Sequence, residues 1–395
     1  MAERQATLNP RIAVLTLVIF SFGSAAFIFA GILETMAADL GVSTAVAGQL
    51  QTAYVLTAAF GSPILAWRLG KLDRRLIVII ALCGAVGFHL ASALSPSFAA
   101  LLPLRAFAGL TGALAIPAAT VSAASLAPLE RRGSAMAMVS AGMTLAFVAG
   151  APLGSVVGAL FGWRATFLFS AALSSLALAV VVAFMPKVPA PVRPQGSRID
   201  LHAIWPIYLT TYLMFAANMT INLYIAPLVR IGAGVTGAGV GAFQLLIGIG
   251  SIGGLWLGAR VADRGGGRAW LIQGFVVQAL AMMLYLSAIH HLAPDGWPSL
   301  VLVGSAIFVA STALFSMTPV TQSRLATATH AAPLAMSINS SVVALGQASG
   351  ASAGGAVLAA FGPTAIPAAA LCISLIGAAA LALAFPRDAV AEARE

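Results

Sequence analysis

The sequence predicts an all-α integral membrane protein with twelve transmembrane helices in two pseudo-symmetric six-helix bundles. Of its 395 residues, 60% are hydrophobic and only 8% are charged, whereas a soluble domain has about 25% charged residues. At roughly 25 to 30 residues per helix and loop, the chain has room for about twelve spans. An internal repeat and an alternating distribution of basic loops complete the prediction.

The repeat places Gly48–Arg75 and Gly241–Arg268 about half a chain apart. Each copy has a glycine, a glutamine three residues later and another glycine ten residues after that, and each ends in a basic loop with Asp-Arg. The matched positions are Gly48 and Gly241, Gln51 and Gln244, Gly61 and Gly254, and Asp73-Arg74 and Asp263-Arg264. Such a repeat indicates two related halves.

Twelve apolar runs are expected to form the spans, six in each half. In the first half they are Ile12–Thr35, Ala45–Trp67, Leu76–Ser95, Phe98–Leu126, Ser134–Phe161 and Arg164–Met185. In the second half they are His202–Val229, Gly237–Val261, Ala269–Ile289, Ser299–Val320, Pro333–Phe361 and Thr364–Phe385. The predicted N-terminal half is residues 1–185 and the C-terminal half is residues 202–395. Residues 186–201, which are rich in proline and charge, form a predicted cytoplasmic linker between them.

Lysine and arginine predict the orientation of these spans. All but three of the 20 basic residues lie in the termini or in loops that follow even-numbered spans; the exceptions are Arg105, Arg164 and Arg230. Because basic residues favour the cytoplasmic side, both termini are expected to be cytoplasmic, in a bacterial-type inner membrane. The first run lacks a small-residue cleavage site, so we interpret it as a retained helix.

Other classes of protein are disfavoured by the composition. The net charge of +9 is spread between apolar runs, which fits membrane topology better than nucleic-acid binding. Cys83 and Cys372 lie in apolar runs and form no metal-ligand or disulfide pattern. His290 and His291 are adjacent in a loop, where solvation is the simpler interpretation than a metal site. No nucleotide-binding P-loop and no nucleophile motif occurs, so we expect no metal site, no cofactor and no enzyme activity.

Two motifs in the first half resemble those of the major facilitator superfamily. LLPLRAFAGLTGA, Leu101–Ala113, is similar to the leucine-x3-arginine-x3-glycine pattern of helix 4, with Arg105 and Gly109 in the key places. GMTLAFVAGAPLG, Gly142–Gly154, with the GWR that follows at Gly162–Arg164, resembles the helix 5 motif of proton-coupled exporters.

Two further segments extend the resemblance to the second half. Val261–Arg268, VADRGGGR, resembles the loop signature Ala-Asp-Arg-x-Gly. In the first copy Trp67 stands where that signature has aspartate, with Asp73 six residues further on as its substitute. Helix 11, Ser337–Gly355, resembles the drug:proton antiporter branch that contains arabinose-efflux-like and chloramphenicol-resistance exporters.

The resemblance implies a secondary active transporter that works by alternating access. The expected activity is proton-coupled efflux of a small organic compound, a drug or a metabolite, with the proton gradient as energy source. The expected partners are a small-molecule substrate, protons and the lipid bilayer, and the protein is expected to act as a monomer that binds no nucleic acid. Two alternatives stay open: a proton-coupled importer of a small metabolite and a non-transporting membrane sensor.

Two ionisable residues inside the spans are candidates for proton coupling, because charge in hydrocarbon is costly without a cavity or partner. Glu34 lies near the outer end of the first span, and Arg105 lies about 10 Å into the fourth. Moving a carboxylate relative to a guanidinium changes its proton affinity, so we predict that Glu34 carries the proton and Arg105 modulates it. The simpler alternatives are that Glu34 is solvated and that Arg105 bonds to helix ends.

Polar residues within the spans are candidates for substrate binding. Uncharged amides with aromatic and methionine neighbours suit a cavity for an amphipathic small molecule, although they also serve as hydrogen bonds between helices. The predicted binding residues are Gln51, Tyr54, Asn218, Asn222, Gln244, Asn339 and Gln347. The predicted gating residues are the charged loop residues Asp73, Arg74, Arg131, Asp263 and Arg264, together with Gly150, Pro152 and Gly154, where a sliding helix contact between the halves is expected.

Overall fold

The computed structural model describes residues 11–28, 30–69, 71–128, 131–189, 201–265, 267–292, 294, 296–329 and 332–384. These residues form helices joined by short turns, with no strand among them, which confirms the all-α prediction. Most of the predicted linker, residues 190–200, lies outside the described residues, and the helix after it begins at Leu201.

Each half of the chain contributes six passes, some of them built from more than one helical segment. The first half contains α1 (Ile12–Phe27), η1 (Ala30–Ile32), α2 (Leu33–Asp39), α3 (Thr44–Leu69), α4 (Arg74–Ala93), α5 (Phe98–Leu126), α6 (Arg132–Leu145), η3 (Ala146–Gly150), α7 (Ala151–Phe161) and α8 (Trp163–Phe184). The second half contains α9 (Leu201–Asn222), α10 (Ile225–Ala233), α11 (Gly239–Asp263), α12 (Arg268–Ile289), α13 (Trp297–Thr327), α14 (Ala332–Phe361), η4 (Pro363–Ala365) and α15 (Ile366–Ala384).

Length and hydropathy support the spanning assignment for most of these passes. Among the described residues, nine helical stretches are long and apolar enough to cross a membrane, and the bent pair α9 and α10 makes a tenth. The other two passes of the twelve are the 16-residue α1 with its continuation α2, and α3, whose apolar character is diluted by polar residues such as Gln49, Gln51 and Arg68.

Two spans that we predicted as continuous helices are broken, and the predictions were wrong there. The first span is interrupted by the 3-10 turn Ala30–Ile32, where Gly31 packs directly against Ser155 of α7. The seventh bends by 58° between α9 and α10. Pro227 lies in the first turn of α10, where a proline is tolerated because the backbone nitrogen there has no partner within the helix, so its position fits a helix that restarts just before it.

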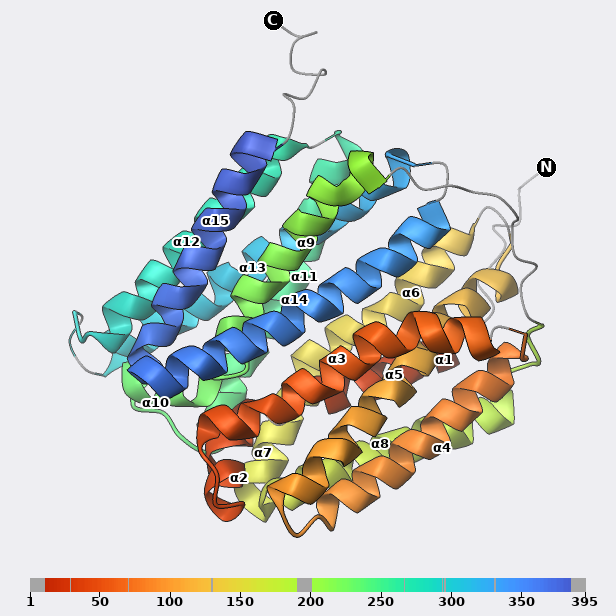
Figure 1. The fold of residues 1–395 in the computed structure, drawn as a ribbon, viewed down its shortest axis with the longest axis horizontal. Helices are drawn as coiled ribbons and strands as arrows, with labels where there is room; N and C mark the ends of the chain where they lie inside the picture. The colour runs from red at the N-terminus through yellow and green to blue at the C-terminus, as the bar shows by residue number, and fades with distance from the viewer. Residues whose placement is uncertain are drawn as a thin grey trace, which may run out of the picture.

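The two halves lie side by side, the first coloured red to yellow-green and the second green to blue in Figure 1. α3 and α14 run along each other between the halves, and α11 packs against α7 and η3. The start of α1 and the end of α15 are on the same side of the bundle, which we call the terminal side (Figure 1). The opposite side, which we call the far side, carries the ends of α2 and α10.

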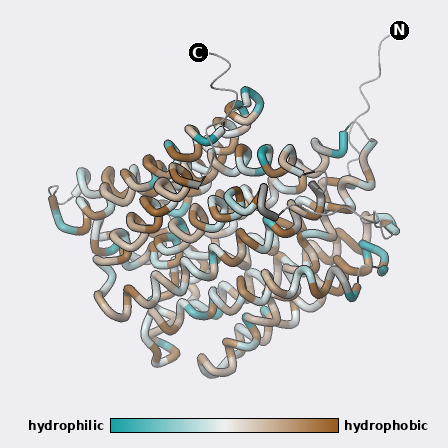
Figure 2. Tube along the Cα trace, turned by 45° about the horizontal axis from the view of Figure 1, so that its top comes forward, coloured by the Kyte–Doolittle hydropathy of each residue, from teal (hydrophilic) through white to brown (hydrophobic). Residues whose placement is uncertain are grey.

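The outer surface of the bundle is apolar along the helices. Exposed large hydrophobic side chains are found on many helices, for example Phe60, Leu160, Ile252 and Trp256. In Figure 2 the hydrophilic colour gathers mainly at turns and helix ends, with hydrophobic colour along the helices. A soluble monomer rarely exposes so much contiguous apolar surface, whereas lipid tails cover such a surface favourably.

The internal repeat has a structural counterpart at the last residue of each copy. Arg75 donates to the carbonyl of Val182 in the last turn of α8 (2.6 Å). Arg268 donates to the carbonyls of Leu381 and Ala382 near the end of α15 (3.0 and 2.5 Å). Each arginine thus satisfies carbonyls that lack a partner at the end of the sixth pass of its own half.

Three residues on the far side join α2 to α8. Asp39 accepts from Arg164 (2.6 Å) and from the indole nitrogen of Trp163 (2.8 Å). The bond from Arg164, followed by that from Trp163, holds the pKa of the Asp39 carboxyl below its ordinary value.

We expect Asp39→Asn to lower the apparent melting temperature of the purified protein slightly at neutral pH, whereas Asp263→Asn, at an exposed carboxylate, should not. Because the pKa of Asp39 is lowered on folding, its stabilisation is present above the ordinary value of 3.8 and is lost as the pH falls through the lowered value. Melting curves of wild type and D39N should therefore differ by a constant amount from roughly pH 5 to 8. Equal melting temperatures at pH 7 would contradict this interpretation.

Candidate functional site: a central cavity between the halves

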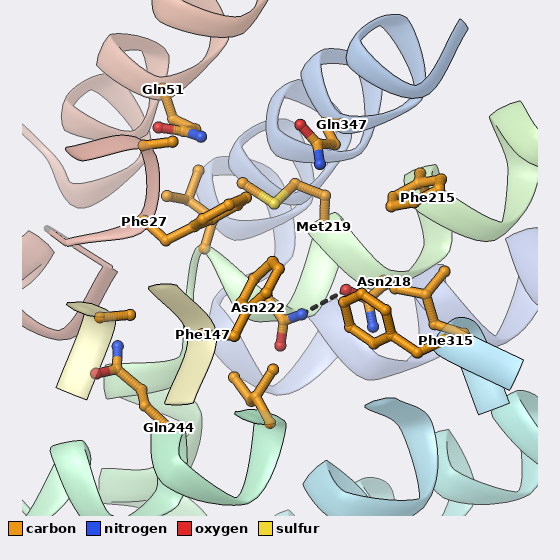
Figure 3. A pocket seen from close by; sticks show the side chains of 15 residues that line it. Phe27, Gln51, Phe147, Phe215, Asn218, Met219, Asn222, Gln244, Phe315 and Gln347 are labelled. Carbon is orange, nitrogen blue, oxygen red and sulfur yellow. Dashed lines mark hydrogen bonds between the residues drawn. The ribbon is translucent and has the colours of Figure 1, made fainter. Parts of the chain in front are cut away.

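A cavity lies between the two halves and is lined by both of them. The lining residues of the first half are Ala26, Phe27, Gln51, Phe147 and Ala151, and those of the second are Phe215, Asn218, Met219, Asn222, Leu223, Gln244, Ile247, Leu314, Phe315 and Gln347. None of these lining residues carries a charge. The cavity therefore offers amide groups, aromatic rings and one thioether to a ligand, as Figure 3 shows.

Five of the seven predicted binding residues line this cavity: Gln51, Asn218, Asn222, Gln244 and Gln347. The other two do not. Tyr54 is buried beneath Arg105 in the first half, and Asn339 is buried about two turns from Gln347 along α14. The structure thus brings the two repeat-matched glutamines together at one cavity, and the binding role of the seven residues stays a prediction.

The amide groups are held by different kinds of partner. Gln51 accepts through Oε1 from the guanidinium of Arg105 (3.4 Å), and Gln244 accepts through Oε1 from the hydroxyl of Ser155 (2.5 Å). In α9, Asn222 donates to the side-chain oxygen of Asn218, a bond drawn as a dashed line in Figure 3. All three contacts orient polar groups around the same space.

Aromatic rings that the sequence prediction missed form one wall of the cavity. Phe27 lies 4.6 Å from Phe147, and Phe147 lies 5.4 Å from Phe315 of the other half, measured between ring centroids. Phe147 belongs to the π-helical turn Ala146–Gly150. Such turns add a residue and redirect the side chains around them, often at functional sites. The motif that contains Phe147 was recognised in the sequence, but its local geometry was not.

Arg105 is fully buried on α5, one layer behind the cavity. Besides its bond to Gln51, it donates to the carbonyl of Ala25 near the end of α1 (3.4 Å). Its guanidinium lies 4.3 Å from the ring centroid of Tyr54 and 5.9 Å from that of Phe167. These contacts give the cation partners within its own half, consistent with the high cost of a buried charge without them.

Glu34 has a different partner from the one that we considered. Its carboxylate accepts two hydrogen bonds from Arg230 of α10, from Nη2 (2.8 Å) and Nε (3.4 Å). Both side chains are partly exposed, 32% for Glu34 and 49% for Arg230. The ion pair joins the first half to the second on the far side, away from Arg105. The proton-coupling role of Glu34 and Arg105 stays a prediction.

Close helix contacts bring the halves together on the far side and at the level of the cavity. Gly48 of α3 packs against the hydroxyl of Tyr224, the residue at the bend between α9 and α10. In α11, Gly248 lies so close to Val148 that an added Cβ would be 2.5 Å from its Cα. Small residues allow this approach of helix backbones in a membrane. The Gly48 contact and the Glu34 ion pair close the far side in this conformation, whereas Gly248 and Val148 meet at the level of the cavity, next to its lining residues Ile247 and Phe147.

The five charged residues that we predicted for gating lie at or next to the ends of helices. Asp73 caps α4 by accepting from the backbone nitrogens of Arg75 and Leu76 (2.9 and 3.3 Å), and the backbone nitrogen of Arg74 donates to Val188 (2.8 Å). Arg131 directly precedes α6 and is partly exposed, whereas Asp263 and Arg264 are exposed at the end of α11.

The three helix 5 residues that we predicted as a sliding contact face two different neighbours. Gly150 packs against Ser24 of α1 and Gly154 against Ile28, the residue after α1, both in their own half, which differs from the contact between halves that we expected. Pro152 does lie at the interface, with its carbonyl beside Gly241 of α11. The gating role of these residues stays a prediction.

The family of the chain follows from a match over most of its length. A model described as the Major Facilitator Superfamily matches residues 15–332. The chain belongs to the Major Facilitator Superfamily. It is thus a membrane transporter by family, and the resemblance seen in its motifs is confirmed.

Relatives within the superfamily cover most of the chain. The inner membrane transport protein YdhP of Escherichia coli strain K12 is 30% identical over 358 residues, which are 89% of this chain and 90% of that protein. The chloramphenicol resistance protein of Streptomyces lividans is 29% identical over 262 residues, 64% of this chain and 66% of that protein.

Solved structures share the architecture at much lower identity. A bacterial homologue of the human lysosomal transporter Spinster has a TM-score of 0.79 at 16% identity, covering 95% of this chain and 96% of that one. The D-xylose–proton symporter has a TM-score of 0.77 at 18% identity, covering 96% and 98%. At these identities the likeness is one of fold, and it confirms the twelve-helix transporter architecture.

Proposed function

We propose that this protein is a proton-coupled exporter of small organic compounds, working by alternating access in the inner membrane with both termini in the cytoplasm. The central cavity carries the proposal, because both halves line it with amides, aromatic rings and a methionine, as expected for an amphipathic ligand. Rocking one half against the other then exposes the cavity to either side in turn.

Three further observations support the proposal. On the predicted orientation the far side is external, and it is closed here by the Glu34–Arg230 ion pair and the contact of Gly48 with Tyr224. The helix 5 motif resembles that of proton-coupled exporters. A relative is named a chloramphenicol resistance protein, which favours export over import.

Transport of chloramphenicol by inverted membrane vesicles tests the proposal. An imposed proton gradient, acidic inside, should drive accumulation of the compound in vesicles that contain the protein, and collapsing the gradient with an uncoupler should stop it. Vesicles without the protein are the control. Accumulation only in right-side-out vesicles would indicate import, and a wider compound panel with no flux in either orientation would indicate a non-transporting protein.

A further inference from the structure

Gln51 lies between the buried guanidinium of Arg105 and the cavity. Its side chain is fully buried in the protein yet lines the cavity, and its Oε1 accepts from Nη2 of Arg105. A guanidinium has donors and no acceptor, so only the oxygen of the amide can face it. The orientation of this amide is therefore fixed by chemistry, with the nitrogen on the side away from Arg105.

The nitrogen of the Gln51 amide has no hydrogen-bond partner among the described residues. Buried N–H groups are almost always paired, and an exception at the wall of a cavity marks a position that accepts a partner. Figure 3 shows Gln51 at the edge of the cavity, opposite Asn222 and beside Gln347. The partner must supply an acceptor atom, because the two hydrogens of the nitrogen can only be donated.

Arg105 does not line the cavity, and its other contacts are with residues of its own half. It donates to the carbonyl of Ala25 and lies over the ring of Tyr54, so the chain fixes its position independently of any ligand. Its effect on the cavity passes through Gln51, whose amide it orients and polarises. A donor polarised in this way is stronger toward an acceptor oxygen.

The rest of the cavity indicates an uncharged ligand. No lining residue carries a charge, so an ionised ligand would lose its hydration without gaining a counter-charge. The rings of Phe27, Phe147 and Phe315 and the thioether of Met219 offer contact to an aromatic or apolar body.

We propose that Gln51 recognises an acceptor oxygen of an uncharged aromatic compound in this cavity, and that Arg105 is a positioning residue that presents the Gln51 amide to it. The proposal rests on the proposed function, since it assigns substrate chemistry to the same cavity. Gln244, the repeat partner, lacks this fixed orientation, because the hydroxyl of Ser155 both donates and accepts.

Photolabelling with benzophenone tests the proposal directly, because benzophenone is uncharged, carries one carbonyl oxygen and reacts with nearby methionine on illumination. In lipid nanodiscs, the wild type should be labelled at Met219 in the cavity. Fluorenone should displace the probe, whereas fluorene, the same ring system without the carbonyl, should displace it about ten-fold less well. Met283, 53% exposed on the outer surface, reports labelling from the lipid as an internal control.

The variants separate recognition from positioning. Gln51→Glu keeps an acceptor toward Arg105 but removes the donor, and Gln51→Leu removes both, so each should reduce labelling of Met219 about ten-fold and leave Met283 unchanged. Arg105→Leu should reduce labelling to a similar degree, and Arg105→Lys should restore part of it.

Unchanged Met219 labelling in Q51E, or none in the wild type, would overturn the assignment. If labelling depends on Gln51 but vesicles export nothing, the proposed function fails and the Gln51 assignment stands. If vesicles export but labelling does not depend on Gln51, the Gln51 assignment fails and the proposed function stands.

Discussion

Replacing Gly248 by valine should abolish transport while leaving the protein folded in the membrane. The glycine lies against the backbone of Val148 in the other half, and an added Cβ would be 2.5 Å from its Cα and 2.8 Å from its nitrogen. Because these neighbours are backbone atoms, the two halves must separate at the level of the cavity to make room, and the closed arrangement of the far side is disturbed. We expect the rate of transport to fall at least about ten-fold, since closure of one side is required in every cycle.

The same helix provides a matched control for this change. Gly253 also lies in α11, but nothing lies within 4 Å of a Cβ placed on it. Gly253→Val should therefore transport like the wild type at equal expression. Equal rates for G248V and the wild type in the vesicle assay would contradict the role that we give to this contact.

Replacing Glu34 by glutamine should abolish substrate-driven proton flux. The amide cannot take up and release a proton as a carboxylate does, and it also loses the ion pair with Arg230 that joins the halves. Among the described residues, Glu34 is the carboxylate that bridges the two halves by an ion pair. Flux is measured in proteoliposomes with an internal pH-sensitive dye after chloramphenicol is added.

Arg230→Gln separates the two consequences of this change. It breaks the same ion pair but keeps the carboxylate, so proton flux should persist, with a shift toward opening of the far side. If E34Q moves protons at the wild-type rate, Glu34 is not the proton carrier. If both variants lose flux to the same extent, the ion pair matters and the titration of Glu34 does not.

Two of the cavity-lining residues could be predicted from the internal repeat. Gln51 and Gln244 occupy equivalent positions in two similar halves, and equivalent positions meet where the halves face each other, at the cavity. Asn218 and Asn222, two of the predicted binding residues, are about one helical turn apart, so they lie on one face of α9 and both line the cavity. Tyr54 shows the limit of the same reasoning: both Gln51 and Tyr54 contact Arg105, but Tyr54 lies almost one turn further along α3 and does not line the cavity.

Contacts between distant segments could not be predicted from local patterns. Arg230 is 196 residues from Glu34 in the chain, and no spacing rule connects them. Pro227 is visible in the sequence and favours a break before α10, but proline alone does not decide it, since α5 contains Pro103 and Pro117 without a break. The π-helical turn at Phe147 could not be predicted, because its sequence is compatible with an ordinary α-helix.

A reversible lock across the halves tests the account most directly. Thr52 and Ser352 face each other between α3 and α14, with 3.1 Å between their hydroxyl oxygens, so cysteines at both positions are close enough for a disulfide. In a background with Cys83 and Cys372 replaced by alanine, oxidation of the Thr52→Cys, Ser352→Cys variant should stop chloramphenicol transport, and reduction should restore it. Full transport by the oxidised, cross-linked protein would contradict alternating access through this interface.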